Sequence, residues 1–413
     1  MSGEDPSACA SCGFPDAKNA CSGCRKVAYC GKICQRDHWA AHKPACKTSQ
    51  ATSAAVAATT APSPKLAHAE GTLRRALEKA RKELGDDAEE TLECLATLAT
   101  FLKRVARFAE AEPFFREALA ARRRTLGAAH RHTLTAASNL AGLLKEQGRL
   151  GEAAPLYHEA LEGRRHALGD AHPDTLRSLS DMGALLRAQK LPGEAEPLLR
   201  EALSAQRRAL GGVHPDALAT ANALAGLLQD RGQLADAEPL YREALAGRRR
   251  ALGDSHPDTL ASINNMAYLL YAKGGVELGE AEALLREAMA GFSRTLGETH
   301  PSTLNCLNSM AILLHEQGKF GEAEGALESA LCGFRAALGG EHPHTLAALH
   351  NLADLLFAVG KAADAEPLLR DAVEGRRRAL GEAHQDTLHS VALLGRVRKT
   401  LVARSKPRET VSA

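Results

Sequence analysis

The chain has 413 residues, of which 45% are hydrophobic and 25% are charged, the composition of an ordinary soluble globular protein. Its 52 basic and 50 acidic residues give a formal net charge of only +2, which argues against a dedicated nucleic-acid-binding protein. No apolar run is long enough to span a membrane, and the first residues, MSGEDPSACASCG, lack the features of a secretory signal. We therefore expect a cytoplasmic location, with the nucleus as the alternative.

Residues 1–46 form the first predicted module, because seven of the ten cysteines lie between Cys9 and Cys46. Their spacing is C-x2-C-x8-C-x2-C-x5-C-x3-C-x7-H-x3-C. Without a secretory signal, such a dense cluster favours metal binding over disulfides. Eight ligands complete two tetrahedral zinc sites and leave no position open to a substrate, so we expect two structural Zn²⁺ ions.

The stretch YCGKICQRDHWAAHKPAC resembles a MYND zinc finger. The interleaved ligands of that family imply one zinc on Cys9, Cys12, Cys30 and Cys34, and a second on Cys21, Cys24, His42 and Cys46. The resemblance also implies a groove for a proline-rich peptide, lined by Tyr29, Gln35 and Trp39. An alternative stays open for Trp39, the only tryptophan, which could instead pack the core of this small module.

The chain beyond the finger is predicted to contain five further parts. Residues 47–66 are rich in Ala, Thr, Ser and Pro without periodicity and are expected to be a flexible linker. Residues 67–84 are predicted to form an N-terminal capping helix and residues 85–380 a repeat array. Residues 381–404 are predicted to form a C-terminal capping helix, and residues 405–413 a disordered tail.

A nonapeptide recurs through the array at intervals of 42 residues, with one interval of 44. One copy, LGDSHPDTL, runs from Leu252 to Leu260. A catalytic His–Asp pair would be needed once, whereas this motif recurs with variation, so we interpret it as a connection between helices. Gly253 can end a helix and Pro257 fits the next first turn, where Asp258 and Thr259 complement the helix dipole. The copies begin at Leu84 (degenerate), Leu126, Leu168, Leu210, Leu252, Leu296, Leu338 and Leu380.

Each unit between two motifs contains two amphipathic helices, the second with small, large and small residues such as Ala153, Tyr157 and Ala160. This pattern resembles tetratricopeptide repeats, and the 42-residue form resembles those of kinesin light chains and nephrocystin-like proteins. The resemblance implies a mainly α fold, a right-handed α-solenoid of about seven helix pairs preceded by the small two-zinc finger. Arginine runs near the ends of the second helices are interpreted as complementing helix dipoles. Cys94, Cys306 and Cys332 are expected to be small buried residues.

The first helices of tetratricopeptide arrays line a concave groove, and this resemblance implies a graded peptide-binding surface. Its asparagine amides could bond the N–H and C=O groups of a peptide backbone. We expect an acidic or aromatic-acidic segment there, unless these side chains are merely solvated. The early repeats would supply a basic end and the later ones polar and aromatic residues: Lys103, Arg104, Lys145 and Arg187, then Asn222, Asn264, Tyr268, Tyr271, Asn308, His350 and Phe357.

The two modules together imply a zinc-binding scaffold or adaptor for proteins, without enzymatic activity and without a membrane or nucleic-acid partner. One alternative is a cargo adaptor like a kinesin light chain, although no heptad coiled coil precedes the repeats. Another is a relative of SMYD-type methyltransferases that lacks the SET domain. No phosphate-binding loop or nucleophile elbow is found in the sequence.

Overall fold

The computed structural model describes residues 19–20, 28–29 and 64–405. The chain divides into two compact units, residues 1–63 and residues 64–413. In the first unit, β1 (Asn19–Ala20) pairs antiparallel with β2 (Ala28–Tyr29). Within residues 64–405 every regular element is helical, and none of these helices combines the length and apolarity needed to cross a bilayer.

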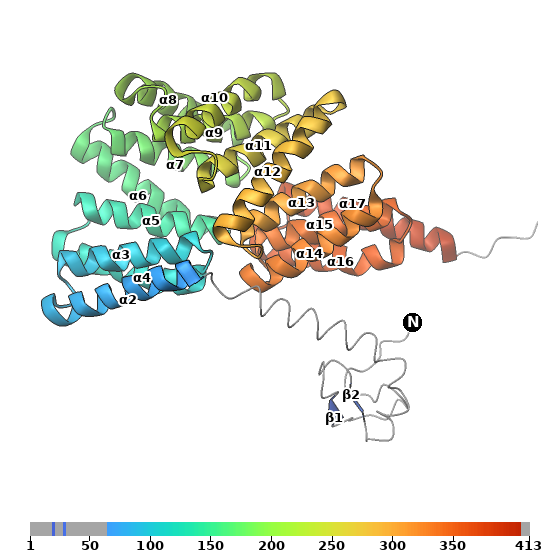
Figure 1. Cartoon of the computed structure of the whole chain (residues 1–413), viewed down its shortest axis with the longest axis horizontal. Coiled ribbons are helices and arrows are strands. Elements are labelled where there is room, and N and C mark those ends of the chain that lie inside the picture. Colours follow the sequence, from blue (N-terminus) through green and yellow to red (C-terminus); the bar gives the residue numbers. More distant parts are fainter. Residues whose placement is uncertain (1–18, 21–27, 30–63, 406–413) are drawn as a thin grey trace, which may run out of the picture. The chain divides into compact units, whose positions relative to one another are not determined.

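Seven helix pairs follow one another within residues 64–405 and stack into a curved solenoid (Figure 1), which confirms the predicted fold class. The first four pairs are α3 (Glu89–Arg104) with α4 (Phe108–Leu126), α5 (Arg131–Glu146) with α6 (Leu150–Leu168), α7 (Pro173–Ala188) with α8 (Pro192–Leu210), and α9 (Pro215–Asp230) with α10 (Leu234–Leu252). The last three are α11 (Pro257–Lys273) with α12 (Leu278–Leu296), α13 (Pro301–Glu316) with α14 (Phe320–Leu338), and α15 (Pro343–Ala358) with α16 (Ala362–Leu380).

Three further elements complete the array. A single helix stands at each end, α2 (Pro64–Leu84) and α17 (Gln385–Ser405), and η1 (Gly275–Glu277) accommodates the longer interval before α12. The helix α2 begins three residues earlier than expected, since the fixed φ of Pro64 suits the first position of a helix. The rest of the expected linker, residues 47–63, and the tail after residue 405 lie outside the described residues.

The recurring nonapeptide joins the second helix of one pair to the first helix of the next. Gly253 has φ +85° and follows α10 directly, while Pro257 occupies the first turn of α11. The N-cap is His256, whose Nδ1 accepts a hydrogen bond from the backbone N–H of Asp258 at 3.2 Å. The interpretation as a helix connection is confirmed, and the structure adds that the histidine ring of the motif caps the helix, while Asp258 lies in its first turn. The same bond recurs at His130, His172, His214, His300, His342 and His384.

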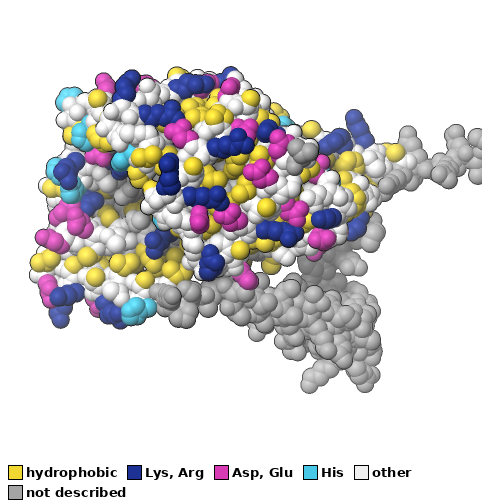
Figure 2. Space-filling view, turned by 45° about the horizontal axis from the view of Figure 1, so that its top comes forward, with side chains coloured by type: hydrophobic (Ala, Val, Ile, Leu, Met, Phe, Trp, Pro, Cys, Tyr) yellow, Lys and Arg dark blue, Asp and Glu magenta, His cyan; other side chains and the backbone are white. Residues whose placement is uncertain are grey.

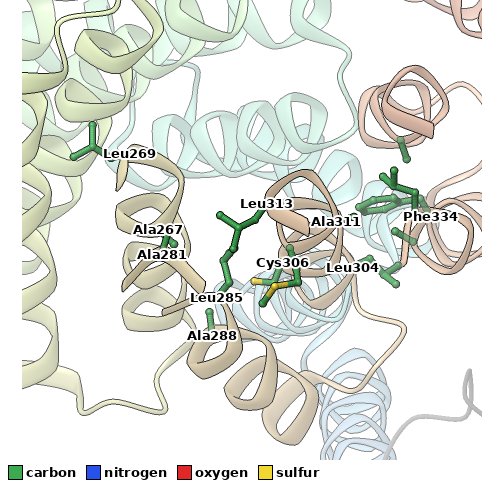
Figure 3. Packing of buried hydrophobic residues seen from close by; sticks show 14 of the residues in the cluster. Ala267, Leu269, Ala281, Leu285, Ala288, Leu304, Cys306, Ala311, Leu313 and Phe334 are labelled. Carbon is green, nitrogen blue, oxygen red and sulfur yellow. The ribbon is translucent and has the colours of Figure 1, made fainter. Parts of the chain in front are cut away.

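The core is built where the second helix of each pair packs closely on its neighbours. Tyr157 is 2% exposed, and Ala153 and Ala160 on either side of it are fully buried, as the small-large-small pattern predicts. Figure 3 shows the corresponding residues of α12, where Leu285 lies between Ala281 and Ala288. A glycine of the second helix also allows it to lie close to the first helix of its pair. A methyl group on Gly291 of α12 would lie only 2.4 Å from Cδ2 of Leu260 of α11.

The three cysteines of the solenoid differ in exposure. Cys306 is 1% exposed, and burial raises the pKa of its thiol to about 12, which suits an inert core residue. Cys94 is half-buried, whereas Cys332 is exposed, so the prediction that all three are buried is wrong. Cys332 follows the buried Leu331 on α14, and one helical step turns a side chain by about 100° away from the core.

The arginines near the ends of the second helices form hydrogen bonds and ion pairs with neighbouring repeats. Arg248 enters the joint between two repeats, where its Nη1 donates to Oγ of Ser262 at 2.7 Å. The next residue, Arg249, pairs with Glu287 of the following second helix at 2.7 Å. Figure 2 shows basic and acidic side chains interspersed over the face of the solenoid that it presents. The runs therefore join repeats in addition to lying near helix ends.

The solenoid curves so strongly that repeats five positions apart come into contact. Nε2 of His300, at the start of α13, lies 3.0 Å from the carbonyl oxygen of Arg104, at the end of α3. One repeat further along, Nε2 of His342 lies 2.7 Å from the carbonyl oxygen of Glu146. Figure 1 shows α13 beside α3, although 196 residues separate the bonded partners. We call this line of contacts the seam.

Candidate functional site

A cavity of about 480 Å³ lies inside the curve of the solenoid and has walls from both sides of the seam. One wall is α3, with Lys103 and Arg104, and the other includes Asn264 of α11 and Asn305 of α13. We call it the first cavity. The curvature thus brings together predicted groove residues that the sequence places in distant repeats.

The polar groups of the first cavity are not fully paired with one another. Asn264 is only 8% exposed, and its Oδ1 has no hydrogen-bond partner within the described residues. The side chain of Lys103 passes close to Gly142, because a methyl group there would lie 3.0 Å from Nζ. Burial lowers the pKa of Lys103, while Glu146 opposes that change. The Arg104 guanidinium lies over the Phe101 ring, 5.7 Å from its centroid.

A second cavity, of about 350 Å³, lies where α7 and α9 approach α17. The guanidinium of Arg187 donates to both carboxylate oxygens of Asp230, at 2.7 and 3.3 Å. Tyr268 also lines this cavity and is 46% exposed. Its ring stacks on that of Tyr271 with centroids 6.0 Å apart. The second cavity therefore offers an aromatic surface, but its predicted cation already has a carboxylate partner.

Acidic side chains on the inner helices reduce the basic character that the sequence suggested. Burial raises the pKa of Asp181, and Lys145 is the first of several cations that oppose this change. With Asp230 and Glu146, three carboxylates stand against the four predicted cations Lys103, Arg104, Lys145 and Arg187. The expected basic end is therefore less basic than the sequence suggested.

The other predicted groove residues lie outside both cavities and mainly join neighbouring repeats. Asn222 accepts from Nδ2 of Asn265 at 3.3 Å, Asn308 accepts from Nδ2 of Asn351 at 3.1 Å, Tyr271 donates to Glu316 at 3.4 Å, and Phe357 lies 5.9 Å from the Arg396 guanidinium.

Sequence reasoning missed the acids Glu146, Asp181 and Asp230 on the inner helices. These acids lie outside the recurring nonapeptide, so the motif itself does not point to them. Glu146 and Asp230 occupy the same position of their repeats, one residue after Lys145 and Gln229. A positional alignment of the repeats shows that this position holds Arg104 in the first repeat and an acid in three later ones, Glu146, Asp230 and Glu316.

His350 is uncharged at neutral pH, and this gives a pH-dependent prediction. Burial, with a smaller contribution from Arg376, lowers the pKa of His350 to about 4, below its ordinary value of 6.5. Ser390 Oγ accepts from Arg376 at 2.5 Å, so its hydroxyl proton is free to donate to Nδ1 of His350, 3.1 Å away. The stability that this neutral ring contributes is present above pH 6.5 and is lost as the pH falls towards 4.

We therefore expect the melting temperature of the wild-type protein to fall more steeply between pH 6.5 and 4 than that of His350→Gln, which does not titrate. Thermal unfolding followed by circular dichroism at a series of pH values measures the difference. Parallel pH profiles for the two proteins would contradict this assignment.

The predicted zinc ligands, Cys9, Cys12, Cys21, Cys24, Cys30, Cys34, His42 and Cys46, lie outside the described residues. The same is true of Gln35 and Trp39. For Tyr29 only the backbone is described, in β2, where it pairs with Asn19.

Comparisons with known proteins recognise both modules. A MYND finger model matches residues 9–46. Two tetratricopeptide repeat models match residues 132–208 and 277–336, and residues 91–132, 217–258 and 345–386, which together span more than half of the chain. A MYND finger implies zinc binding, and both kinds of module indicate protein partners.

Several crystal structures are similar to the solenoid. The putative kinesin light chain TPR-like repeats of Podosopora anserina are 28% identical and cover 50% of this chain and 97% of their own, with a TM-score of 0.39. BtubC (BKLC) from P. vanneervenii is 23% identical and covers 56% of this chain and 92% of its own, with a TM-score of 0.43. A Rap protein complexed with Competence and Sporulation Factor is 16% identical, covers 83% and 100%, and has a TM-score of 0.54. This chain belongs to the tetratricopeptide-repeat proteins and carries a MYND finger at residues 9–46.

Proposed function

We propose that this protein is a scaffold that holds a short acidic or aromatic-acidic peptide segment on the inner surface of its solenoid. One observation carries the proposal: the first cavity places the cations Lys103 and Arg104 opposite Asn264, whose Oδ1 is buried without a partner among the described residues. A peptide N–H could satisfy that oxygen, since a buried unpaired acceptor is costly. An acidic side chain could pair with Arg104.

The second cavity suggests where an aromatic residue of such a segment would bind. Tyr268 is 46% exposed and offers a ring face beside Tyr271. The charges that line this cavity already have partners, since Arg187 pairs with Asp230, Lys190 with Asp386 and Arg231 with Glu196. We therefore assign the acidic residue of the ligand to the first cavity and the aromatic residue to the second.

We also propose that the finger holds two structural zinc ions on the ligands predicted above, and that Tyr29, Gln35 and Trp39 accept a proline-rich segment. A proline-rich peptide is already extended, so binding it costs little conformational entropy. With one site on the finger and one in the solenoid, a partner that carries both segments gains effective concentration. The cargo-adaptor role remains an alternative, and we propose no catalytic role.

Charge reversal in the first cavity tests the solenoid site. The full chain is used to probe an array of peptides that combine Tyr or Trp with Asp or Glu. It should bind these peptides more strongly than matched peptides in which Lys replaces the acidic residues. Arg104→Glu should weaken the best acidic peptide about 10-fold or more, because a charged hydrogen bond contributes about 1.5–3 kcal/mol. Fluorescence anisotropy with the labelled peptide measures this affinity.

Arg250→Glu is the matched control, since Arg250 is an exposed arginine on α10 outside both cavities. It should leave the affinity within about twofold of the wild type, as expected for a screened surface charge. If both variants lose affinity equally, or if neither does, the first cavity is not the acidic site.

A further inference from the structure

The seam is held by histidines that bond in two directions. In His300, Nδ1 accepts the backbone N–H of Ser302 at 3.1 Å, and Nε2 lies 3.0 Å from the carbonyl oxygen of Arg104. Because Nδ1 is an acceptor, the proton of the neutral ring is on Nε2, which therefore donates across the seam. His342 makes the same pair of bonds, with the N–H of His344 at 3.2 Å and the carbonyl oxygen of Glu146 at 2.7 Å.

The seam continues in register along the array. Gly148 packs so tightly on Pro343 that an added methyl group would lie 2.6 Å from Pro343 Cγ. One repeat further on, Lys190 Nζ lies 3.9 Å from Oδ1 of Asp386. Nε2 of His384, which occupies the motif position of His300 and His342, is buried there without a partner among the described residues. Two histidine bonds and one ion pair therefore join three successive repeats to those five positions further along.

The contacts across the seam join repeats of successive superhelical turns of the solenoid, and they are few. A solenoid derives its stability from contacts between adjacent repeats, and the seam adds contacts to none of those interfaces. Each hydrogen bond across it replaces a bond to water and contributes little net free energy. The seam can therefore open while every repeat remains folded.

Both inner cavities depend on the seam. The first has Lys103 and Arg104 of α3 on one side and Asn264 of α11 on the other. The second has Lys190 on one side and Asp386 on the other. If the two superhelical turns separate at the seam, each cavity loses one wall.

We propose that His300 and His342 form a clasp that opens and closes the solenoid, so that the inner cavities exist as binding sites only in the closed form. A peptide that contacts both walls binds the closed form alone and by linkage stabilises it. The coupling to a peptide rests on the proposed function, whereas the clasp itself does not.

The clasp is tested in the ligand-free full chain by zero-length carbodiimide crosslinking. Lys190 and Asp386 are close enough to form an amide in the closed form, and mass spectrometry of the digest quantifies it. We expect His300→Ala/His342→Ala to lower the yield at least about threefold. The control His214→Ala/His256→Ala removes the same N-caps without touching the seam and should retain the wild-type yield.

A second pair of variants leaves every histidine in place. Gly148→Ala pushes a methyl group into Pro343, whereas Gly232→Ala has the same positive φ, 76° against 77°, with open space around it. Only Gly148→Ala should lose the crosslink. An unchanged yield in both seam variants, or an equal loss in seam and control variants, overturns the clasp.

The coupling is tested separately with the best acidic peptide of the array. Gly148→Ala should bind it about fivefold or more weakly, and Gly232→Ala with wild-type affinity. Wild-type affinity in Gly148→Ala, with its crosslink lost, would leave the clasp standing but overturn the coupling. If the array yields no acidic ligand, the proposed peptide site fails and the crosslinking result still decides the clasp.

Discussion

Leu260→Ala is expected to lower the free energy of unfolding by about 2–5 kcal/mol, because it deletes a fully packed side chain at a helix joint. Leu260 is 1% exposed and meets Gly291 of the second helix in its own repeat. Gly291→Ala alone should also destabilise, by about 1–3 kcal/mol, since its methyl group collides with Leu260. Urea unfolding followed by circular dichroism measures both values.

The double variant makes this prediction specific. Once Leu260 is shortened, the methyl group of Gly291→Ala has room, and alanine is about 1 kcal/mol better than glycine within a helix. The second substitution should therefore stabilise the first variant, so that its effect differs by about 2–4 kcal/mol between the two backgrounds. Leu388→Ala is the control, since Leu388 holds the same motif position in α17 but is 53% exposed. Equal losses at Leu260 and Leu388 would contradict the packing argument.

Removal of zinc is expected to unfold the finger completely and to leave the solenoid folded. A module of under 50 residues cannot bury enough core unaided, and structural zinc in such peptides contributes about 10–16 kcal/mol at pH 7. Metal analysis should give two zinc ions per chain, and chelation should remove both without changing the helical signal or the melting temperature of the repeats.

Cysteine variants separate zinc ligands from bystanders. Cys30→Ser should lower the zinc content below two ions per chain, whereas Cys332→Ser should retain both, because Cys332 is an exposed free thiol on α14. One ion per chain in the wild type would contradict the proposed ligand count. Loss of helical signal on chelation would contradict the independence of the two modules.

The repeated parts of the fold could be predicted because a local physical need recurs in every unit. Gly253 and Pro257 mark a helix end and a helix start by their own backbone preferences, and alanines mark close helix crossings. The role of His256 was harder to foresee, because histidine is not among the common N-cap residues and its ring bonds the backbone only in this turn geometry.

The candidate site could be predicted only in part, since it depends on how small rotations between repeats add up. Lys103 and Asn264 lie on the inner surface, but no local pattern indicates that they meet in one cavity. The bond from His300 to Arg104 spans 196 residues and follows from the accumulated curvature. The pairing of Arg187 with Asp230 also joins two repeats, which is why the basic end was overstated.

Site-specific photocrosslinking tests most directly whether the inner surface is where this protein binds its partners. Tyr268 lines the second cavity and is 46% exposed, and Phe320 lies outside both cavities and is 44% exposed, so the two positions differ in location and hardly in accessibility. With p-benzoylphenylalanine at each position of the full chain in cells, adducts to partner proteins should form at position 268 and be largely absent at position 320. Equal adducts at both positions, or adducts at position 320 alone, would contradict the account.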